Sequence, residues 1–237
     1  DVSLFSGLSD INVSAAGDIN VKGATTAAIT AATTSGKVTV VGGSSQTATA
    51  KGGFDLSGST GAISVTDSAQ GAVASSVLGG STVSITSTSK AAGATTGTIT
   101  VGSSTKAPTG DVTITSSIVE AKGTTNTAGG AIAVTGGEDV VITQSASKAV
   151  QSTALANGTI TNAAVTVTGK ATTKSVTVDS SAAVAAVTTR LAVAAEAEVT
   201  TATFEAMTAT ETMIVNGLTF TSTGATTAAQ AAAAFSN

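Results

Sequence analysis

The stretch GAIAVTGGEDVVITQS, residues 130–145, holds two short segments of alternating apolar residues on either side of a Gly-Gly-Glu-Asp corner. Ile132 and Val134 are the apolar pair of the first segment, and Val140 and Ile142 are that of the second. Alternation with a period of two is typical of a β-strand that buries one face. Because a strand with two inward side chains buries too little by itself, this stretch predicts strands that stack on equivalents from elsewhere in the chain.

The same apolar-x-apolar strand recurs along the chain in two series. One series begins its strands at Ile11, Val38, Ile63, Ile99, Ile132 and Val165, and the other at Ile19, Phe54, Val83, Val112, Val140 and Val176. The spacing within each series averages about 31 residues, a period typical of stacked repeats. The repeats predict an all-β fold, a parallel β-helix of about six coils, each with two clear strands and a weaker third. A row of antiparallel sandwich modules is the alternative, and it would need hairpins and larger core residues.

This register makes a definite expectation about the core. Val112, Ile114, Val140 and Ile142 should be buried, with Val112 next to Val140. The small β-branched residues that dominate the chain suit such a narrow interior, because they pack well in pleated, stacked strands.

The composition excludes several classes of protein. The net charge is −4 and the chain has ten Lys and Arg residues, which leaves no basic stripe for nucleic acid. No apolar run reaches the roughly 18 residues that a membrane-spanning helix needs. The absence of Cys suits an extracellular bacterial protein that folds without disulfides. The chain begins without Met or a signal peptide, and we interpret it as a fragment or processed piece of a longer protein.

The pattern changes after residue 182, which divides the chain into a solenoid over residues 1–182 and a module over residues 183–237. Asn216-Gly217 between two apolar triplets is a strong signal for a β-hairpin. Thr226 or Thr227 could cap an Ala-rich helix that runs through Phe235. We therefore expect a βββα unit at the C-terminal end.

The chain offers little for catalysis. It has no His for a general base and no Cys for a nucleophile or zinc site. Sugar-cleaving enzymes use paired carboxylates and aromatic platforms, and the chain has no Trp or Tyr. The sequence therefore predicts a protein that is not an enzyme.

Carboxylates at the corners are the remaining signal. Asp10, Asp18, Asp111 and Asp139 each directly precede the first apolar residue of a strand. With the coils in register, Asp111 and Asp139 stack on each other with Glu138 alongside, and like charges so close repel unless something neutralises them. The ordinary interpretation is turn chemistry, in which Asp bonds nearby backbone. The alternative is a calcium site formed by Asp111, Glu138 and Asp139.

The stretches GGAIAVTGGEDVVITQSASKAV and AAVTVTGKATTKSVTVDSSAA resemble the Thr/Ala/Gly/Val-rich region of Caulobacter-type surface-layer proteins, and more broadly the RTX-associated β-strand-repeat surface proteins of proteobacteria. The resemblance covers about residues 36–182. It implies type I secretion, calcium-dependent lattice formation and anchoring to cell-surface polysaccharide. The chain departs from the family pattern because it lacks the calcium-binding nonapeptides.

These observations lead to a functional expectation. We expect a structural protein of the bacterial cell surface, a secreted β-solenoid that assembles with copies of itself into a layer or filament. The alternative is a stalk or polysaccharide-binding segment of a large RTX-type adhesin.

Overall fold

A computed structural model describes residues 1–89, 96–120, 125–149, 158–184, 206, 208–215 and 218–234. The chain divides into two compact units, Asp1–Thr189 and Arg190–Asn237. Each unit is described by itself below.

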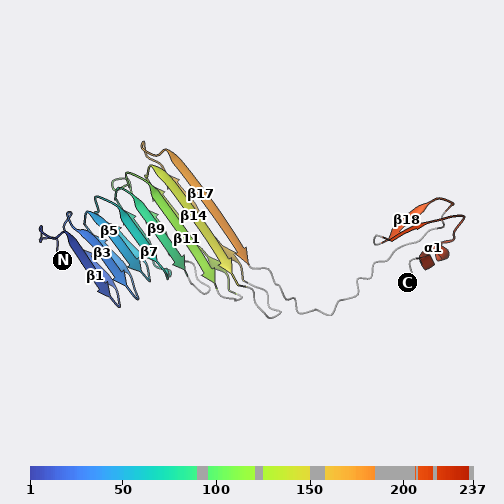
Figure 1. Cartoon of the computed structure of the whole chain (residues 1–237), viewed down its shortest axis with the longest axis horizontal. Helices are drawn as coiled ribbons and strands as arrows, with labels where there is room; N and C mark the ends of the chain where they lie inside the picture. The colour runs from blue at the N-terminus through green and yellow to red at the C-terminus, as the bar shows by residue number, and fades with distance from the viewer. Residues whose placement is uncertain are drawn as a thin grey trace. The chain divides into compact units, whose positions relative to one another are not determined.

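The first unit is built from two parallel sheets that the chain visits alternately. Among the described residues, sheet A has eight strands in chain order: β1 (Asp10–Ala15), β3 (Ala28–Thr33), β5 (Ser45–Ala50), β7 (Ile63–Asp67), β9 (Val83–Ser89), β11 (Val112–Glu120), β14 (Asp139–Lys148) and β17 (Ser175–Val184). Sheet B has seven: β2 (Ile19–Lys22), β4 (Val38–Val41), β6 (Phe54–Ser57), β8 (Ser75–Leu78), β10 (Ile99–Val101), β13 (Ile132–Thr135) and β16 (Val165–Thr168). Figure 1 shows the strands of sheet A lying side by side. The predicted all-β fold with parallel pairing between coils is confirmed, as a parallel β-helix requires, and this pairing rules out the antiparallel sandwich modules.

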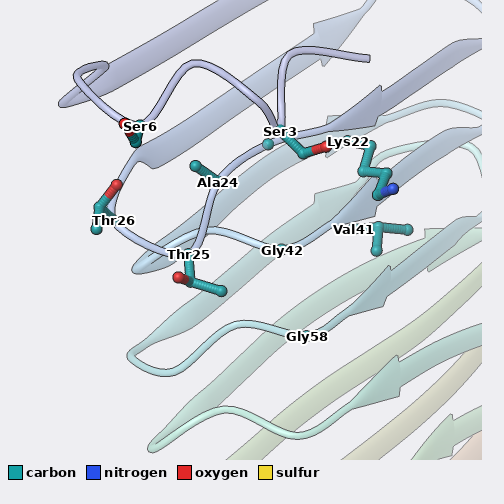
Figure 2. Close-up of a pocket in the computed structure, with 10 residues that line it drawn as sticks. Ser3, Ser6, Lys22, Ala24, Thr25, Thr26, Val41, Gly42 and Gly58 are labelled. Atoms are coloured by element: carbon teal, nitrogen blue, oxygen red, sulfur yellow. The ribbon is translucent and has the colours of Figure 1, made fainter.

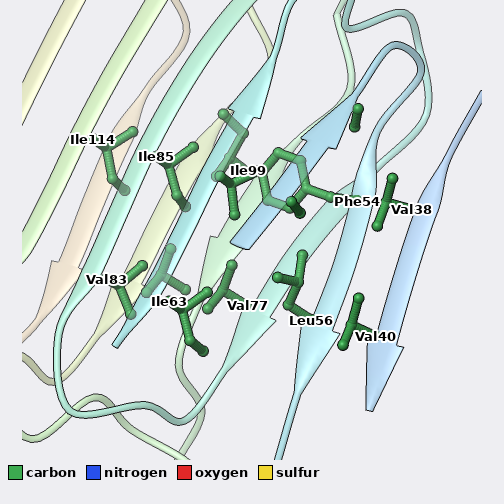
Figure 3. Close-up of a cluster of buried hydrophobic side chains, with 14 of the residues drawn as sticks. Val38, Val40, Phe54, Leu56, Ile63, Val77, Val83, Ile85, Ile99 and Ile114 are labelled. Atoms are coloured by element: carbon green, nitrogen blue, oxygen red, sulfur yellow. The ribbon is translucent and has the colours of Figure 1, made fainter. Parts of the chain in front are cut away.

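The two sheets share one apolar core. Inward rows from both sheets form a single cluster of buried side chains, to which Phe54 and Leu56 of sheet B and Ile63 and Ile85 of sheet A contribute (Figure 3). Successive side chains of a strand point to opposite faces of its sheet, so every second residue enters the core and the residues between them face outward.

The core register that the sequence predicts between β11 and β14 is confirmed. Val112 pairs with Val140 and Ile114 with Ile142. All four side chains are fully buried, each with 0% of its surface exposed.

The coils are shorter at the N-terminal end than the predicted period of about 31 residues. The register positions of sheet A advance by 18, 17 and 17 residues (Ile11 to Ile29, to Gln46, to Ile63), and then by 20, 29, 28 and 36 residues on reaching Val83, Val112, Val140 and Val176. The predicted count of about six coils is therefore too low.

The two predicted series are also mixed in this region. Val38 lies in sheet B, although its series includes Ile11 and Ile63 of sheet A, and Ile19 and Phe54 lie in sheet B, although theirs continues at Val83 of sheet A. Strands β3, β5 and β8 belong to neither series, because at least one position of each inward pair carries Ala, Gln or Ser. These small or polar residues are accommodated because neighbouring strands supply the Ile and Val around them.

The longer coils have a third side. Strand β12 (Thr127–Ala128) pairs in parallel with β15 (Ile160–Thr161) in a separate two-stranded sheet. Ile118, Ala146 and Ile160 form a second apolar cluster beside it. The weaker third strand that the sequence predicts is therefore present in these two coils.

The second unit contains a hairpin and a helix. Strand β18 (Thr212–Val215) pairs antiparallel with β19 (Leu218–Thr221), and α1 spans Ala228–Ala234. Thr227 caps this helix: its Oγ1 accepts from the N–H of Gln230 at 3.3 Å, and Gln230 Oε1 accepts from the N–H of Thr227 at 3.0 Å. The predicted hairpin and cap are confirmed, while the third predicted strand lies outside the described residues. No helix among the described residues is long and apolar enough to cross a membrane.

Candidate functional site

The corner between β13 and β14 depends on two glycines. Gly136 and Gly137 adopt φ values of 89° and 92°, a backbone region that residues with a Cβ rarely occupy. A Cβ on Gly137 would also lie 2.9 Å from Cγ2 of both Val112 and Val140. The Gly-Gly pair therefore turns the chain while the core closes behind it, and it brings Glu138 and Asp139 to the surface at the start of β14.

The three carboxylates of the predicted calcium site bond to protein groups. Asp111 Oδ1 accepts a hydrogen bond from the N–H of Asp139 at 3.3 Å. Asp139 Oδ1 accepts from the hydroxyl of Ser175 at 2.7 Å, on the following coil. Glu138 pairs with the ammonium group of Lys174, also on that coil. Each carboxylate thus links its own coil to the next one.

This coil-to-coil link is a form of turn chemistry that the sequence did not indicate. The expected partner of each Asp was its own local backbone, whereas the observed partner stands one coil later. Sheet B uses the same device, because Asp18 Oδ1 accepts from the N–H of Lys37 at 2.7 Å.

Calcium binding at this corner remains a prediction. In the part of the chain that the structure describes, no group of three or more His, Cys, Asp or Glu side chains is arranged to hold a metal ion. The ammonium group of Lys174 already places a positive charge at this corner. Its hydrogen bond to Glu138 raises the pKa of Lys174, and the charges of Asp139 and Asp111 contribute less.

A buried ion pair lies at the far ends of β11 and β14. Glu120 and Lys148 are register partners, and Glu120 Oε2 lies 2.9 Å from Lys148 Nζ. Their side chains are 3% and 1% exposed. Thr127 Oγ1 donates to the carboxylate, and Lys148 Nζ donates to the carbonyl oxygen of Thr125. These partners satisfy the buried charges, and they tie β11 and β14 to the segment that forms the third side.

A second polar cluster fills the interior where the coils begin to lengthen. Asp67 is fully buried, and its carboxylate accepts from the N–H groups of Gly53 at 2.8 Å and Ala69 at 3.2 Å. Burial raises the pKa of Asp67, although the backbone hydrogen bonds oppose the shift. Gln70 lies near it, accepting from Ser87 Oγ at 2.6 Å. These groups are structural, because their hydrogen bonds close the corner on the protein itself.

A depression near the N-terminal end has a volume of about 520 Å³ (Figure 2). It is lined by Ser3, Ser6, Lys22, Gly23, Ala24, Thr25, Thr26, Val41, Gly42 and Gly58. Lys22 is the charged residue of this lining, and its Nζ lies 3.5 Å from Asp1 Oδ2. An acid–base pair poised for catalysis is not present among these ten residues.

The C-terminal end of the stack exposes its core rows. Val176 and Val178 of β17 are 48% and 46% exposed, although their register partners Val140 and Ile142 are fully buried. Among the described residues, β17 pairs with β14 and β16 pairs with β13, so each strand presents an unpaired backbone edge on its other side. We call this end, formed by β16 and β17, the wide end.

The N-terminal end is partly covered. The N–H of Val2 donates to the carbonyl oxygen of Lys22 at 2.9 Å, and the Val2 side chain packs against the core. Leu4 and Phe5, which follow it, are 94% and 61% exposed.

Comparison with known proteins finds no family model, no curated protein and no solved structure that matches the chain.

Proposed function

We propose that this chain is a structural protein of the bacterial cell surface that associates with copies of itself through the open ends of its β-helix. The observation that supports this proposal is the exposed apolar row at the wide end. Val176 and Val178 are nearly half exposed, although their register partners in the preceding coil are buried. An unpaired strand edge with an apolar row is a template for pairing with another chain.

The ends favour contact between molecules for a second reason. A β-helix gains stability from the interface between neighbouring coils, so a terminal coil lacks half of its stabilising contacts. Covering β17 with a strand of a second molecule would pair the backbone groups along its outer edge and bury both valines. Calcium at contacts between molecules and cell-surface polysaccharide are further proposed partners, and the support for them is the family resemblance.

The test is the size distribution of the full chain by analytical ultracentrifugation and negative-stain electron microscopy. In Val178→Lys, the inward charge at the wide end should shift large assemblies to smaller species without unfolding the chain, because charged edges resist pairing. Val141→Lys is the matched control, since Val141 is 39% exposed on the outer face of β14, whose two backbone edges are already paired with β11 and β17. A parent chain that stays monomeric at high concentration, with and without calcium, would refute self-association and favour the stalk of an adhesin.

A further inference from the structure

The outer face of sheet A carries a regular grid of threonine. Six consecutive strands, β3 to β14, contribute two outward residues each, and parallel pairing aligns these residues in two columns. The first column is Thr30, Thr47, Ser64, Ser84, Thr113 and Val141, and the second is Ala32, Thr49, Thr66, Thr86, Thr115 and Thr143. We call these twelve residues the threonine array. Eight of them are threonine and none is charged, so the array is chemically uniform.

The array faces solvent. The residues that alternate with it along the strands point into the core, and all but Ala32 and Thr143 of the array are exposed. Among the described residues, no protein group forms a side-chain hydrogen bond with any hydroxyl of the array, so these hydroxyls are available to water. The strands that carry it run side by side in Figure 1.

Sheet B shows that composition alone does not produce this face. Its outward positions include Lys22, Val41, Asp55 and Leu78, a mixture of charged and apolar side chains. Asp55 also ties up its neighbour, since it accepts from Ser76 Oγ at 2.8 Å. The two sheets have the same strand pairing and the same low-charge sequence to draw on, yet the grid occurs on sheet A.

The array also survives the changes in coil length. Between β3 and β14 the coils grow from 17 residues (Ile29 to Gln46) to 28 (Val112 to Val140). The strands of sheet A also lengthen, from six residues in β3 to ten in β14, but the positions of the array stay paired. The two columns continue without a shift in register from Thr47 to Thr115. A purely structural role needs the inward rows in register, whereas it places no demand on which residues stand outward.

The spacing of the array, which is that of β-sheets in general, suits a ligand of matching periodicity. Neighbouring strands lie about 4.8 Å apart, and outward residues on one strand lie about 6.7 Å apart. These two repeats are close to the oxygen repeats on the prism face of hexagonal ice. Threonine offers a hydroxyl that bonds to water and a methyl group that orders the water around it, on a χ1 bond that its branching makes stiff. A crystalline polysaccharide is less well suited to this face, because the array offers no aromatic ring on which a sugar ring could stack and the chain has no Trp or Tyr.

We propose that the threonine array is an ice-binding surface, on which the hydroxyl and methyl groups hold a layer of ordered water that merges with the lattice of an ice crystal. The absence of charge within the array supports this function, because ions hold their hydration water in shells that do not fit the ice lattice. The proposal does not depend on self-association, since the array lies on the face of sheet A and the wide end lies at its edge.

The experiment measures partition of the full chain, labelled on its lysines with an amine-reactive dye, into a slowly grown ice hemisphere. Lysine labelling leaves the array untouched because the array contains no lysine. Inhibition of ice recrystallisation by the unlabelled chain is the second measurement. The parent should concentrate in the ice and slow recrystallisation, whereas an ordinary protein is excluded from growing ice.

Two variants locate the activity. Thr86→Tyr places a bulky ring in the middle of the array and should lower both activities at least tenfold. Thr166→Tyr is the matched control, because Thr166 is an exposed strand threonine of β16 in sheet B, and it should leave both unchanged. If Thr86→Tyr lowers the melting temperature, Thr86→Val replaces it as the test. Valine keeps the shape of the side chain and removes only the hydroxyl, so both activities should fall. Exclusion of the parent from ice, equal effects of the two tyrosines, or binding to insoluble cellulose or chitin instead of ice would overturn the proposal.

Discussion

The buried pair of Glu120 and Lys148 makes a quantitative prediction. With their charged atoms 2.9 Å apart, the attraction is about 6 kcal/mol at an effective dielectric constant of about 20. Taking two ions out of water costs several kcal/mol for each, so the net contribution of the pair to stability is small. Removing one partner should nevertheless cost about 3–5 kcal/mol, because it leaves the other charge buried and unpaired.

A double-mutant cycle separates these two effects. Glu120→Leu and Lys148→Met should each lower the free energy of unfolding by about 3–5 kcal/mol. The double variant should lose only about 1–3 kcal/mol, since no charge remains and the remaining cost is the unpaired hydroxyl of Thr127. The assay is urea unfolding followed by far-UV circular dichroism, with hydrogen exchange in β14 to locate the loss. Single variants that each cost less than about 1 kcal/mol, or a double variant that equals their sum, would refute the buried pair.

Three further predictions test the core, the corner and the interior acid. Ile142→Asp should cost several kcal/mol of stability in urea unfolding, because it buries a charge with no partner, whereas Val141→Asp on the outer face should be nearly neutral. Millimolar calcium should leave the melting temperature unchanged, because Lys174 and Ser175 already engage Glu138 and Asp139; a calcium-dependent rise that disappears in Asp111→Asn with Asp139→Asn would instead establish the site. Burial raises the pKa of Asp67 above its ordinary value of 3.8, so its contribution to stability is present at low pH and is lost as the pH rises through the folded-state pKa. The free energy of unfolding of the parent, relative to that of Asp67→Asn, should therefore fall as the pH rises from 3.8 through the folded-state pKa. A difference that does not vary with pH would contradict the raised pKa of Asp67.

The sequence predicts the later coils better than the earlier ones for a physical reason. β11 and β14 carry Val and Ile at both inward positions, and this pattern fixes their register. In β5 the equivalent position is Gln46, whose Nε2 donates to the carbonyl oxygens of Gly42 at 2.6 Å and Ser57 at 2.8 Å. This buried glutamine occupies the core row and bonds to the backbone of two corners, and a pattern of apolar pairs does not include it.

The buried ion pair was missed for a different reason. Charged residues are expected on the surface, so Glu120 and Lys148 stood outside the predicted core. Their positions held a usable signal, because each stands eight residues after an inward valine, Val112 or Val140, and an even separation along a strand means the same face. The hydrogen bonds from Asp111 and Asp139 to the next coil require that the corners of neighbouring coils are aligned. The spacing of apolar residues predicts this alignment only where both coils are strongly apolar.

The growth in coil length bears on how copies of the chain would associate. At the N-terminal end of the stack, which we call the narrow end, β1 spans six residues, whereas β17 at the wide end spans ten. A strand edge of six residues cannot satisfy one of ten, so stacking of a narrow end on a wide end would leave backbone groups unpaired. The wide end is therefore better matched to a second wide end, in a contact with two-fold symmetry. Such a contact yields pairs only, and growth into a layer or filament needs another surface, to which the exposed Leu4 and Phe5 at the narrow end would contribute apolar contacts.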